Sequence, residues 1–459
     1  MALIVNGLSG ALAAQAALNA ASQNIANVMT PGYTRQGALL AAVSAKQAGA
    51  LNAGSGVAVP ALLRFSDGYK SLQMWQGASA LGERATVQPY LSQLEQVVGN
   101  DAASLNSGLD AFFGALNAAS VDPSSGPLRQ QVLTAADALA QRFNSLNQVL
   151  SNQRVAVYQQ RAATVDGINN LTAAVATLNR EIAVTRASGI NPSGLIDERD
   201  QKIDALAKLV ALQVVEQPDG SRSLSLRGGQ PLVVGAIAAK LALQGEPDGS
   251  QTLALAFAKE SFTLGAGNLG GELGGLGDFE RRVLTPLMAS VTDMAEALTV
   301  RTNTQLAAGY ALDGAVGQPL FEFDATSTTA LLRVADGLVA EDLAFSTDPA
   351  LPGDSGNLLA LIELKSQPVG LTSLGTVLFG DAVTQLVGKL GMDSQQNQAA
   401  LATAQTVRDQ AEESWKSTSG VNSDEEAIAI MQFQQMYQAN MKVIAVANEL
   451  FDSTLAMMR

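Results

Sequence analysis

The sequence contains no cysteine and no histidine among its 459 residues. These absences exclude thiol nucleophiles, imidazole bases, disulfides and zinc sites of the Cys/His type. Aromatic residues make up only 5% of the chain, so its cores must rest on alanine, leucine, valine and isoleucine. No pair of carboxylates stands out from the other charged residues. The sequence therefore predicts no catalytic site, no metal site and no cofactor.

The chain is also poor in basic residues. Its formal net charge of −14 disfavours contact with phosphate backbones, so we expect no nucleic-acid partner. No apolar run approaches the roughly 18 uninterrupted residues typical of a membrane helix. The stretch "LVVGAIAAKLAL" is short and contains Lys240, so we expect no membrane insertion. The first residues lack the basic start of a cleaved secretory signal.

What the chain does have is a long apolar stripe at each end. The first helix should stop at Thr30-Pro31-Gly32, because Pro31 disfavours helical geometry at Thr30 and Gly32 can adopt a left-handed turn. The last helix should begin at Ser423, with Glu426 completing a capping box. Both could be ordinary bundle helices, but neither can bury its stripe alone. We therefore predict an assembly interface formed by Leu8, Leu12, Leu18, Ile25, Met431, Met441, Ile444, Asn448, Phe451 and Leu455.

A third helical region lies in the middle of the chain. Apolar residues recur at near-heptad spacing from Asp122 to Ser188, with Gly167 as the one weak point, and predict a long helix of a rod-like domain. The stretch "LIDERDQKIDALAKLV" predicts a short amphipathic helix after it. We interpret its "DERD" run as a solvated helix start rather than a carboxylate site.

From Leu212 onward, apolar residues recur at every second position, which is typical of strands. "ALQVVEQPDGSRSLSL" and "KLALQGEPDGSQTLALAF" each predict two strands around a Pro-Asp-Gly turn. Helix should return from Phe279 to Leu306 and from Gln395 to Trp415. Between these helices, the region from Pro319 to Thr384 is rich in loops and compatible with strands.

One motif, "GAGNLG" from Gly265 to Gly270, matches the turn of dinucleotide-binding domains. Its context argues against that function, because hairpins precede it instead of a parallel βαβ unit and further glycines follow it. We interpret it as a flexible hinge between the hairpins and the next helix. A dinucleotide-dependent enzyme remains the remote alternative.

Both ends resemble the axial proteins of the bacterial flagellum. The stretches that carry the resemblance are "LSGALAAQAALNAASQNIANVMTPGYTRQ" and "SGVNSDEEAIAIMQFQQMYQANMKVIAVANELFDSTL". Within that family, "TPGYTRQ" and "ANELFDSTL" are most similar to the hook-associated proteins, as are the internal stretches "LIDERDQKIDALAKLV" and "GGELGGLGDFERRVL". A rod or hook subunit with the same ends is the alternative, but those chains are β-rich between their ends.

The resemblance implies a structural protein that joins hook to filament and is needed for filament assembly and motility. It implies a mainly α fold with a β-rich insertion. The expected domains are discontinuous: a coiled-coil-like inner-tube domain, a long-helix domain and a reduced β-hairpin outer domain. Their ranges are 1–35 with 421–459, then 36–192 with 272–318 and 386–420, then 195–271 with 319–385.

The resemblance also implies partners and a location. The expected partners are further copies of the chain in a ring or helical assembly, the hook protein, a second hook-associated junction protein and an export chaperone. The expected location is the extracellular flagellum, reached through the flagellar type III apparatus without a cleaved signal peptide.

Overall fold

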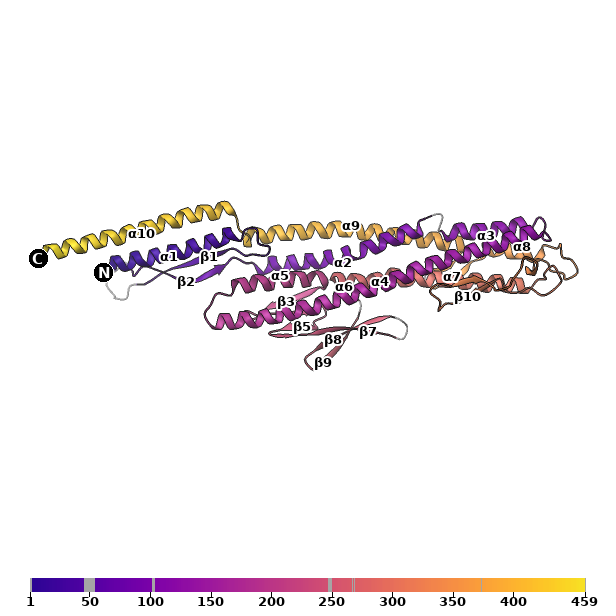
Figure 1. The fold of residues 1–459 in the computed structure, drawn as a ribbon, viewed down its shortest axis with the longest axis horizontal. Helices are drawn as coiled ribbons and strands as arrows, with labels where there is room; N and C mark the ends of the chain where they lie inside the picture. The colour runs from indigo at the N-terminus through magenta and orange to yellow at the C-terminus, as the bar shows by residue number, and fades with distance from the viewer. Residues whose placement is uncertain are drawn as a thin grey trace.

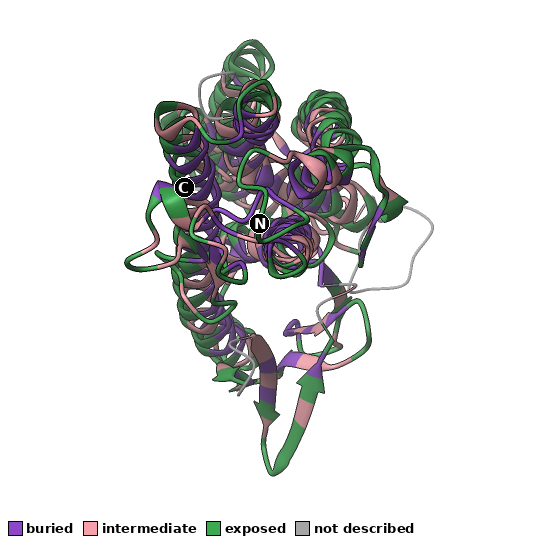
Figure 2. Ribbon diagram, turned by 90° about the vertical axis from the view of Figure 1, so that its right-hand side faces the viewer, coloured by how far each residue is buried: buried purple, intermediate pink, exposed green. Residues whose placement is uncertain are grey.

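The computed structural model describes residues 2–44, 54–100, 104–246, 250–265, 267, 269–372 and 374–458. These residues form a long rod of helices, and the two ends of the chain lie close together at one tip of it (Figure 1). Seen along the rod, the buried faces of the helices turn inward and strands lie outside the bundle (Figure 2). The expected mainly α fold with small β-rich parts is confirmed.

The rod is built from long helices. They are α1 (Ala2–Ala26), α2 (Gly68–Val98), α3 (Leu105–Ala119), α4 (Gly126–Ala187), α5 (Ser193–Leu209), α6 (Gly271–Phe279), α7 (Thr285–Ala307), α8 (Gly356–Glu363), α9 (Phe379–Ser419) and α10 (Ser423–Met457). A π-helical turn, Glu280–Leu284, joins α6 to α7, and two 3₁₀ turns lie at Ala340–Asp342 and Leu364–Ser366.

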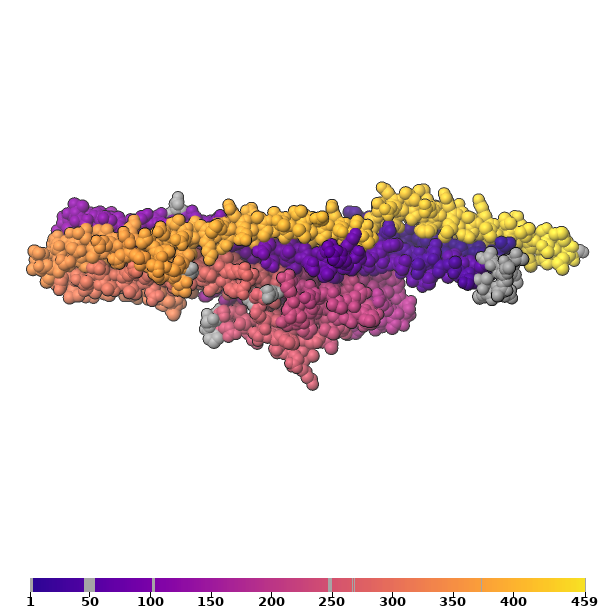
Figure 3. Space-filling model, turned by 180° about the vertical axis from the view of Figure 1, so that it is seen from behind, coloured from indigo at the N-terminus to yellow at the C-terminus, as the bar shows by residue number. Residues whose placement is uncertain are grey.

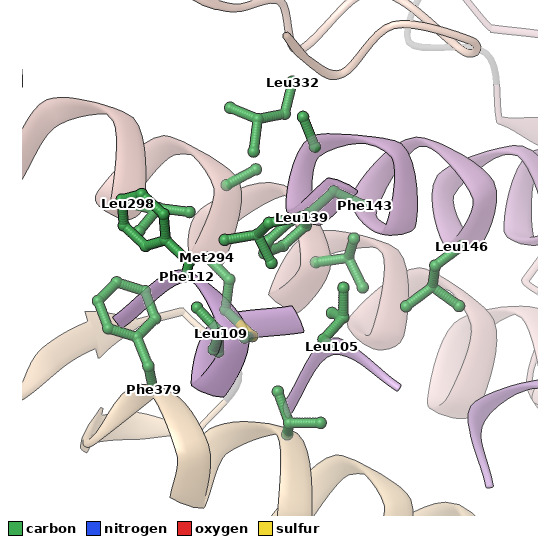
Figure 4. Close-up of a cluster of buried hydrophobic side chains, with 14 of the residues drawn as sticks. Leu105, Leu109, Phe112, Leu139, Phe143, Leu146, Met294, Leu298, Leu332 and Phe379 are labelled. Carbon is green, nitrogen blue, oxygen red and sulfur yellow. The ribbon is translucent and has the colours of Figure 1, made fainter. Parts of the chain in front are cut away.

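Helix α4 confirms the long central helix. It has 62 residues and runs through Gly167 without a break, which makes it roughly 93 Å long. Apolar residues of its first part enter the larger hydrophobic core, together with residues of α3, α7 and α9, and those of its last part enter the smaller one. Figure 4 shows side chains from these helices meeting, Leu139 and Phe143 of α4 among them. A fully buried row of this kind explains why the helix needs no partner molecule.

The strands form small antiparallel sheets. They are β1 (Gln36–Ala42), β2 (Val57–Arg64), β3 (Leu212–Glu216), β4 (Arg222–Leu226), β5 (Pro231–Val234), β6 (Ile237–Ala238), β7 (Lys240–Gly245), β8 (Gln251–Phe257), β9 (Glu260–Leu264), β10 (Phe321–Phe323), β11 (Leu332–Val334), β12 (Val369–Leu371) and β13 (Gly375–Val377). The sheet orders are β1-β2, β3-β4-β5-β6, β7-β8-β9, β10-β11 and β12-β13. Both predicted hairpins are confirmed as β3–β4 and β7–β8. The predicted turn at Pro247–Gly249 lies outside the described residues.

Several predicted boundaries differ from the structure. Asn422, not Ser423, caps α10, because its side chain accepts hydrogen bonds from the amides of Asp424 and Glu425. Helix α9 begins at Phe379, well before Gln395, since Phe379 is itself buried in the larger core. The region from Pro319 to Thr384 also contains the helix α8.

The predicted β-rich outer domain does not form one packed unit. Buried residues of 212–264 lie in the smaller hydrophobic core with α2, α4 and α5. Buried residues of 320–371 lie in the larger core with α3, α4 and α7. The spacing of apolar residues could not assign the two segments to different cores, because both segments have the same pattern typical of strands. The remaining domain limits stay predictions.

Within the described residues, two helices are long and apolar enough, by length and composition alone, to cross a membrane: Leu3–Ala26 and the continuous stretch Gly271–Ala307. Both have partners inside the chain. Helix α1 packs along α10, and the second stretch supplies Leu273, Leu284 and Met294 to the two cores.

Candidate assembly interface and its junction with the rod

The two terminal helices pack against each other in an antiparallel pair. Small residues make the contact on the α1 side, where Ala14 and Ala17 are at most 2% exposed. A Cβ atom on Gly7 would lie 2.9 Å from Ile444 Cγ1, and one on Gly10 would lie 2.3 Å from Asn440 Oδ1. The absence of larger side chains therefore lets α1 lie close to α10.

The large apolar residues of the pair point outward. Of the predicted interface residues, Leu18, Ile25 and Ile444 are half-buried and the other members are exposed; the exposed fractions are Leu8 51%, Leu12 58%, Met431 55%, Met441 45%, Phe451 60% and Leu455 49%, with Asn448 also exposed. Ile444 is partly shielded from water because it packs against Gly7.

The turn after α1 is held by side-chain hydrogen bonds. The Asn24 amide group, 1% exposed, donates to the Gln36 carbonyl at 2.8 Å and accepts from the Gln36 amide at 2.9 Å. The Tyr33 hydroxyl donates to the same Asn24 oxygen at 2.9 Å. Gly32 has φ of +71°, which confirms its predicted left-handed turn. The chain is thus fixed as it leaves the terminal pair.

A largely buried ion pair between β2 and α5 ties this turn to the rod. Arg64 Nε, at the end of β2, donates to Asp197 Oδ1 of α5 at 2.8 Å, and the Thr34 amide donates to Asp197 Oδ2 at 3.1 Å. Arg64 also donates to Asp200 at 3.1 Å. Burial raises the pKa of the Asp197 carboxyl, and Arg64 opposes that shift. Because Asp197 is buried, removal of Arg64 would leave an uncompensated charge.

Helix α5 binds other elements in the same way. Asp204 forms a bidentate ion pair with Arg408 of α9, with N–O distances of 2.8 and 2.9 Å. Arg199, 1% exposed, donates to the Gly220 carbonyl at 2.6 Å, and burial lowers its pKa to about 10. Asp200 also pairs with Arg222 of β4. We define the polar hub as Arg64, Asp197, Arg199, Asp200, Asp204, Arg222 and Arg408.

The polar hub corrects our interpretation of "DERD" as a solvated helix start. Asp197 and Arg199 are 6% and 1% exposed. The amphipathic helix itself is confirmed as α5, but its polar side faces other parts of the chain. A structural role fits the hub better than acid-base chemistry, because its carboxylates are held by guanidinium groups within the chain. No group of metal-binding side chains occurs in the ranges that the structure covers.

The β1–β2 hairpin lies beside the terminal pair. We had placed residues 36–64 in the long-helix domain, but both strands pack along α1. Leu39, Leu40, Leu62 and Leu63 are each about two-fifths exposed. Arg35, just before β1, forms an ion pair with Glu425 of α10 at 2.7 Å. The hairpin therefore extends the apolar surface of the terminal pair.

The "GAGNLG" stretch has a packing role at its described end. Gly270 and Gly271 both have φ of +59°. A Cβ atom on Gly271 would lie 2.5 Å from the Leu209 carbonyl carbon, and one on Gly275 would lie 2.4 Å from the Glu83 carbonyl oxygen. These glycines let α6 pack on α5 and α2, so the hinge that we expected is a close contact. Ala266 and Asn268 lie outside the described residues.

Comparison with known proteins places the chain in a family. The family model described as the flagellar hook-associated protein FlgK helical domain matches residues 91–321, just over half of the sequence. The chain belongs to this family. A second model, described as the C-terminal part of the flagellar basal body rod proteins FlgEFG, matches residues 417–457 and therefore all of α10.

Two members of the family match along nearly the whole chain. Flagellar hook-associated protein 1 of Escherichia coli (strain K12) is 27% identical over 548 residues, covering 99% of each chain. The protein of the same name from Bacillus subtilis (strain 168) is 26% identical, covering 96% of this chain and 95% of its own. The first alignment is longer than this 459-residue chain, so that relative has insertions relative to it.

A solved structure supports the fold. The flagellar hook junction protein FlgK from Burkholderia pseudomallei superimposes with a TM-score of 0.67 at 18% identity. The match covers 76% of this chain and 100% of that one. At this identity the likeness concerns the fold alone.

Proposed function

We propose that the chain is a structural subunit of the bacterial flagellum that joins the hook to the filament. The observation that carries the proposal is the outward apolar face of α1 and α10. Leu12, Met431 and Phe451 are each more than half exposed although they belong to a regular apolar stripe. Membership of the FlgK family and the names of the relatives support the same function.

Such a face is costly to leave in water. Full burial of one leucine, methionine or phenylalanine side chain is worth about 1.5–3 kcal/mol. The terminal pair exposes several of them in a row, so association of neighbouring pairs would be strongly favourable. In the proposed assembly, α1 and α10 of several copies lie side by side as an inner tube, and the rod extends outward from them.

The partners and the route follow from the same proposal. The subunit contacts copies of itself, the hook protein and a second hook-associated junction protein. An export chaperone delivers it, and it leaves the cell through the flagellar type III apparatus. It acts as a structural protein and not as an enzyme. The absence of histidine and cysteine agrees with that role.

Two alternatives are less well supported. The match of α10 to rod proteins agrees with a rod or hook subunit, but the helical-domain match at residues 91–321 favours a hook-associated protein. A dinucleotide-dependent enzyme would need a parallel βαβ unit around the glycine turn, whereas β7, β8 and β9 before it pair antiparallel. A rise in unfolding temperature with added dinucleotide would support the enzyme.

The decisive experiment separates folding from assembly. The double variant Phe451→Asp with Leu455→Asp puts two charges on the outward face of α10. Val155→Asp is the matched control, because Val155 is 53% exposed on α4, far from the terminal pair. Both proteins should unfold at the wild-type denaturant concentration.

Only the double variant should fail in cells. We expect it to be exported but to leave hooks without filaments, with filament subunits shed into the medium and swimming lost. Normal swimming by the double variant would refute the proposed function. Unfolding of its purified monomer would show that the face belongs to an ordinary core.

A further inference from the structure

Exposed methionines are concentrated on the last helix of the chain. Among the residues that the structure describes, the exposed methionines are Met29 88%, Met392 66%, Met431 55%, Met441 45%, Met457 79% and Met458 82%. Four of these six lie on α10 or directly after its last residue. Figure 3 shows α10, in yellow, uncovered by other parts of the chain on this side of the molecule. We call residues 431, 441, 457 and 458 the α10 methionines.

The α10 methionines belong to the surface that the proposed function assigns to assembly. Met431 and Met441 are two of the predicted interface residues, and Met458 continues the spacing of Phe451 and Leu455 along the same helix. Their sulfur atoms are therefore open to solvent in a free subunit. In an assembled subunit, the neighbouring copies or the hook cover them.

Methionine brings a chemistry to this surface that leucine would not. Its thioether sulfur attacks one oxygen of a peroxide, the O–O bond breaks and an S–O bond forms. With hydrogen peroxide the products are methionine sulfoxide and water, so the sulfur is oxidised by two electrons and the peroxide is reduced. The sequence has no cysteine whose thiol could react in their place.

Oxidation changes what the surface can bind. The sulfoxide oxygen is a polar acceptor, and burial of such a group without a hydrogen-bond donor is unfavourable. The core of the rod is protected from the same reaction, because Met294 in the larger core is 0% exposed. A peroxide can therefore alter the assembly surface of a free subunit and leave the folded rod unchanged.

We propose that the α10 methionines are an oxidation site that controls assembly. A peroxide converts them to sulfoxides in the free subunit, and the oxidised face of α10 no longer joins a neighbouring copy or the hook. Subunits that have already assembled are protected, because their neighbours cover the sulfur atoms. The inference rests on the proposed function, since it needs a surface that becomes buried on assembly.

The test replaces all four α10 methionines with leucine, which keeps an apolar side chain of similar volume. Met392→Leu is the matched control, because Met392 is 66% exposed but lies on α9 of the rod. The wild-type protein and both variants are purified and treated with hydrogen peroxide. Mass spectrometry locates the sulfoxides. Binding to hooks isolated from cells that lack the protein is then measured by sedimentation.

Peroxide should lower the binding of the wild-type protein and of Met392→Leu by about tenfold or more, without changing their unfolding midpoints in denaturant. The leucine variant should keep its binding. A methionine sulfoxide reductase with a dithiol as reductant should restore binding of the oxidised wild-type protein. This recovery decides the matter if the leucine variant fails to fold. In intact flagella, the α10 methionines should resist peroxide that oxidises Met392.

The results that would overturn the inference differ from those that would refute the proposed function. Full binding by wild-type protein that carries the four sulfoxides would overturn the inference and leave the proposed function standing. Equal loss of binding by the oxidised leucine variant would also overturn it, as would failure of the reductase to restore binding. Failure of untreated wild-type protein to bind hooks would refute the proposed function, and the inference with it.

Discussion

Helices α4 and α10 carry similar apolar spacing but bury it in opposite ways. In α4, Leu139, Phe143 and Leu150 are completely buried within the chain. In α10, Met431 and Phe451 are 55% and 60% exposed. A helical stripe therefore predicts that a contact exists, but it does not say whether the partner is in the same chain. The exposed stripe is the one that implies assembly.

The contact within the terminal pair follows a different rule from the core around α4. Phenylalanine and leucine fill the core, whereas alanine and glycine form the buried side of α1. Small residues bury little area per residue but allow the backbones to approach. The pair is therefore held by close approach of the two backbones, and its large side chains remain available to neighbours.

The largest expected effect tests the buried helix against the exposed one. Phe143→Ala removes a fully buried ring from the larger core and should lower the free energy of unfolding by about 3–5 kcal/mol. Phe451→Ala, the same change on the exposed stripe, should leave the unfolding midpoint in denaturant nearly unchanged while it weakens filament attachment. If the two variants lose similar stability, α10 is an ordinary core helix.

The next effect concerns the link between the two regions. Arg64→Ala leaves the buried Asp197 carboxylate without its guanidinium partner and should cost about 3 kcal/mol. The loss should appear as faster proteolysis around residues 27–36. Arg333→Ala, which removes an ion pair at an arginine that is 55% exposed, is the control and should change little. Equal cleavage of both variants would show that the polar hub does not hold the junction.

The elements of the fold were largely predictable, because period and turn signals are local. The lengths of α4 and α5 and the two hairpins follow from such signals. The polar hub was not predictable, since Arg64 and Asp197 are 133 residues apart and nothing in the sequence shows that they meet. The partner of the small residues of α1 was not predictable either, because alanines and glycines permit close approach of any helix, and only the fold shows that Gly7 and Gly10 meet α10.

A smaller effect is expected inside the terminal pair. Gly7→Val places a branched side chain where a Cβ atom would already lie 2.9 Å from Ile444 and 3.2 Å from the Asn440 carbonyl oxygen. It should push α1 away from α10 at a cost of about 1–3 kcal/mol. Hydrogen exchange of α1 amides should accelerate while exchange in α4 stays unchanged. Gly388→Val, at an open position on α9, is the control. Unchanged exchange in α1 would contradict close packing of the pair.

The smallest expected effect is a pH dependence of stability that arises in the rod and not in the terminal pair. Tyr158 lies on α4, where burial, reinforced by Glu280, raises the pKa of its hydroxyl from 10.0 to about 12. The folded state therefore favours the neutral phenol. Its contribution to stability is complete below about pH 10 and is lost as pH rises towards about 12. Between pH values of about 9 and 12, the denaturant concentration at the unfolding midpoint should therefore fall further for the wild-type protein than for Tyr158→Phe. Because the lost contact lies in the rod, the difference should appear in the exchange of α4 amides before that of α1 amides. Equal losses in the two proteins would show that this hydroxyl ionises as freely in the rod as in the unfolded chain.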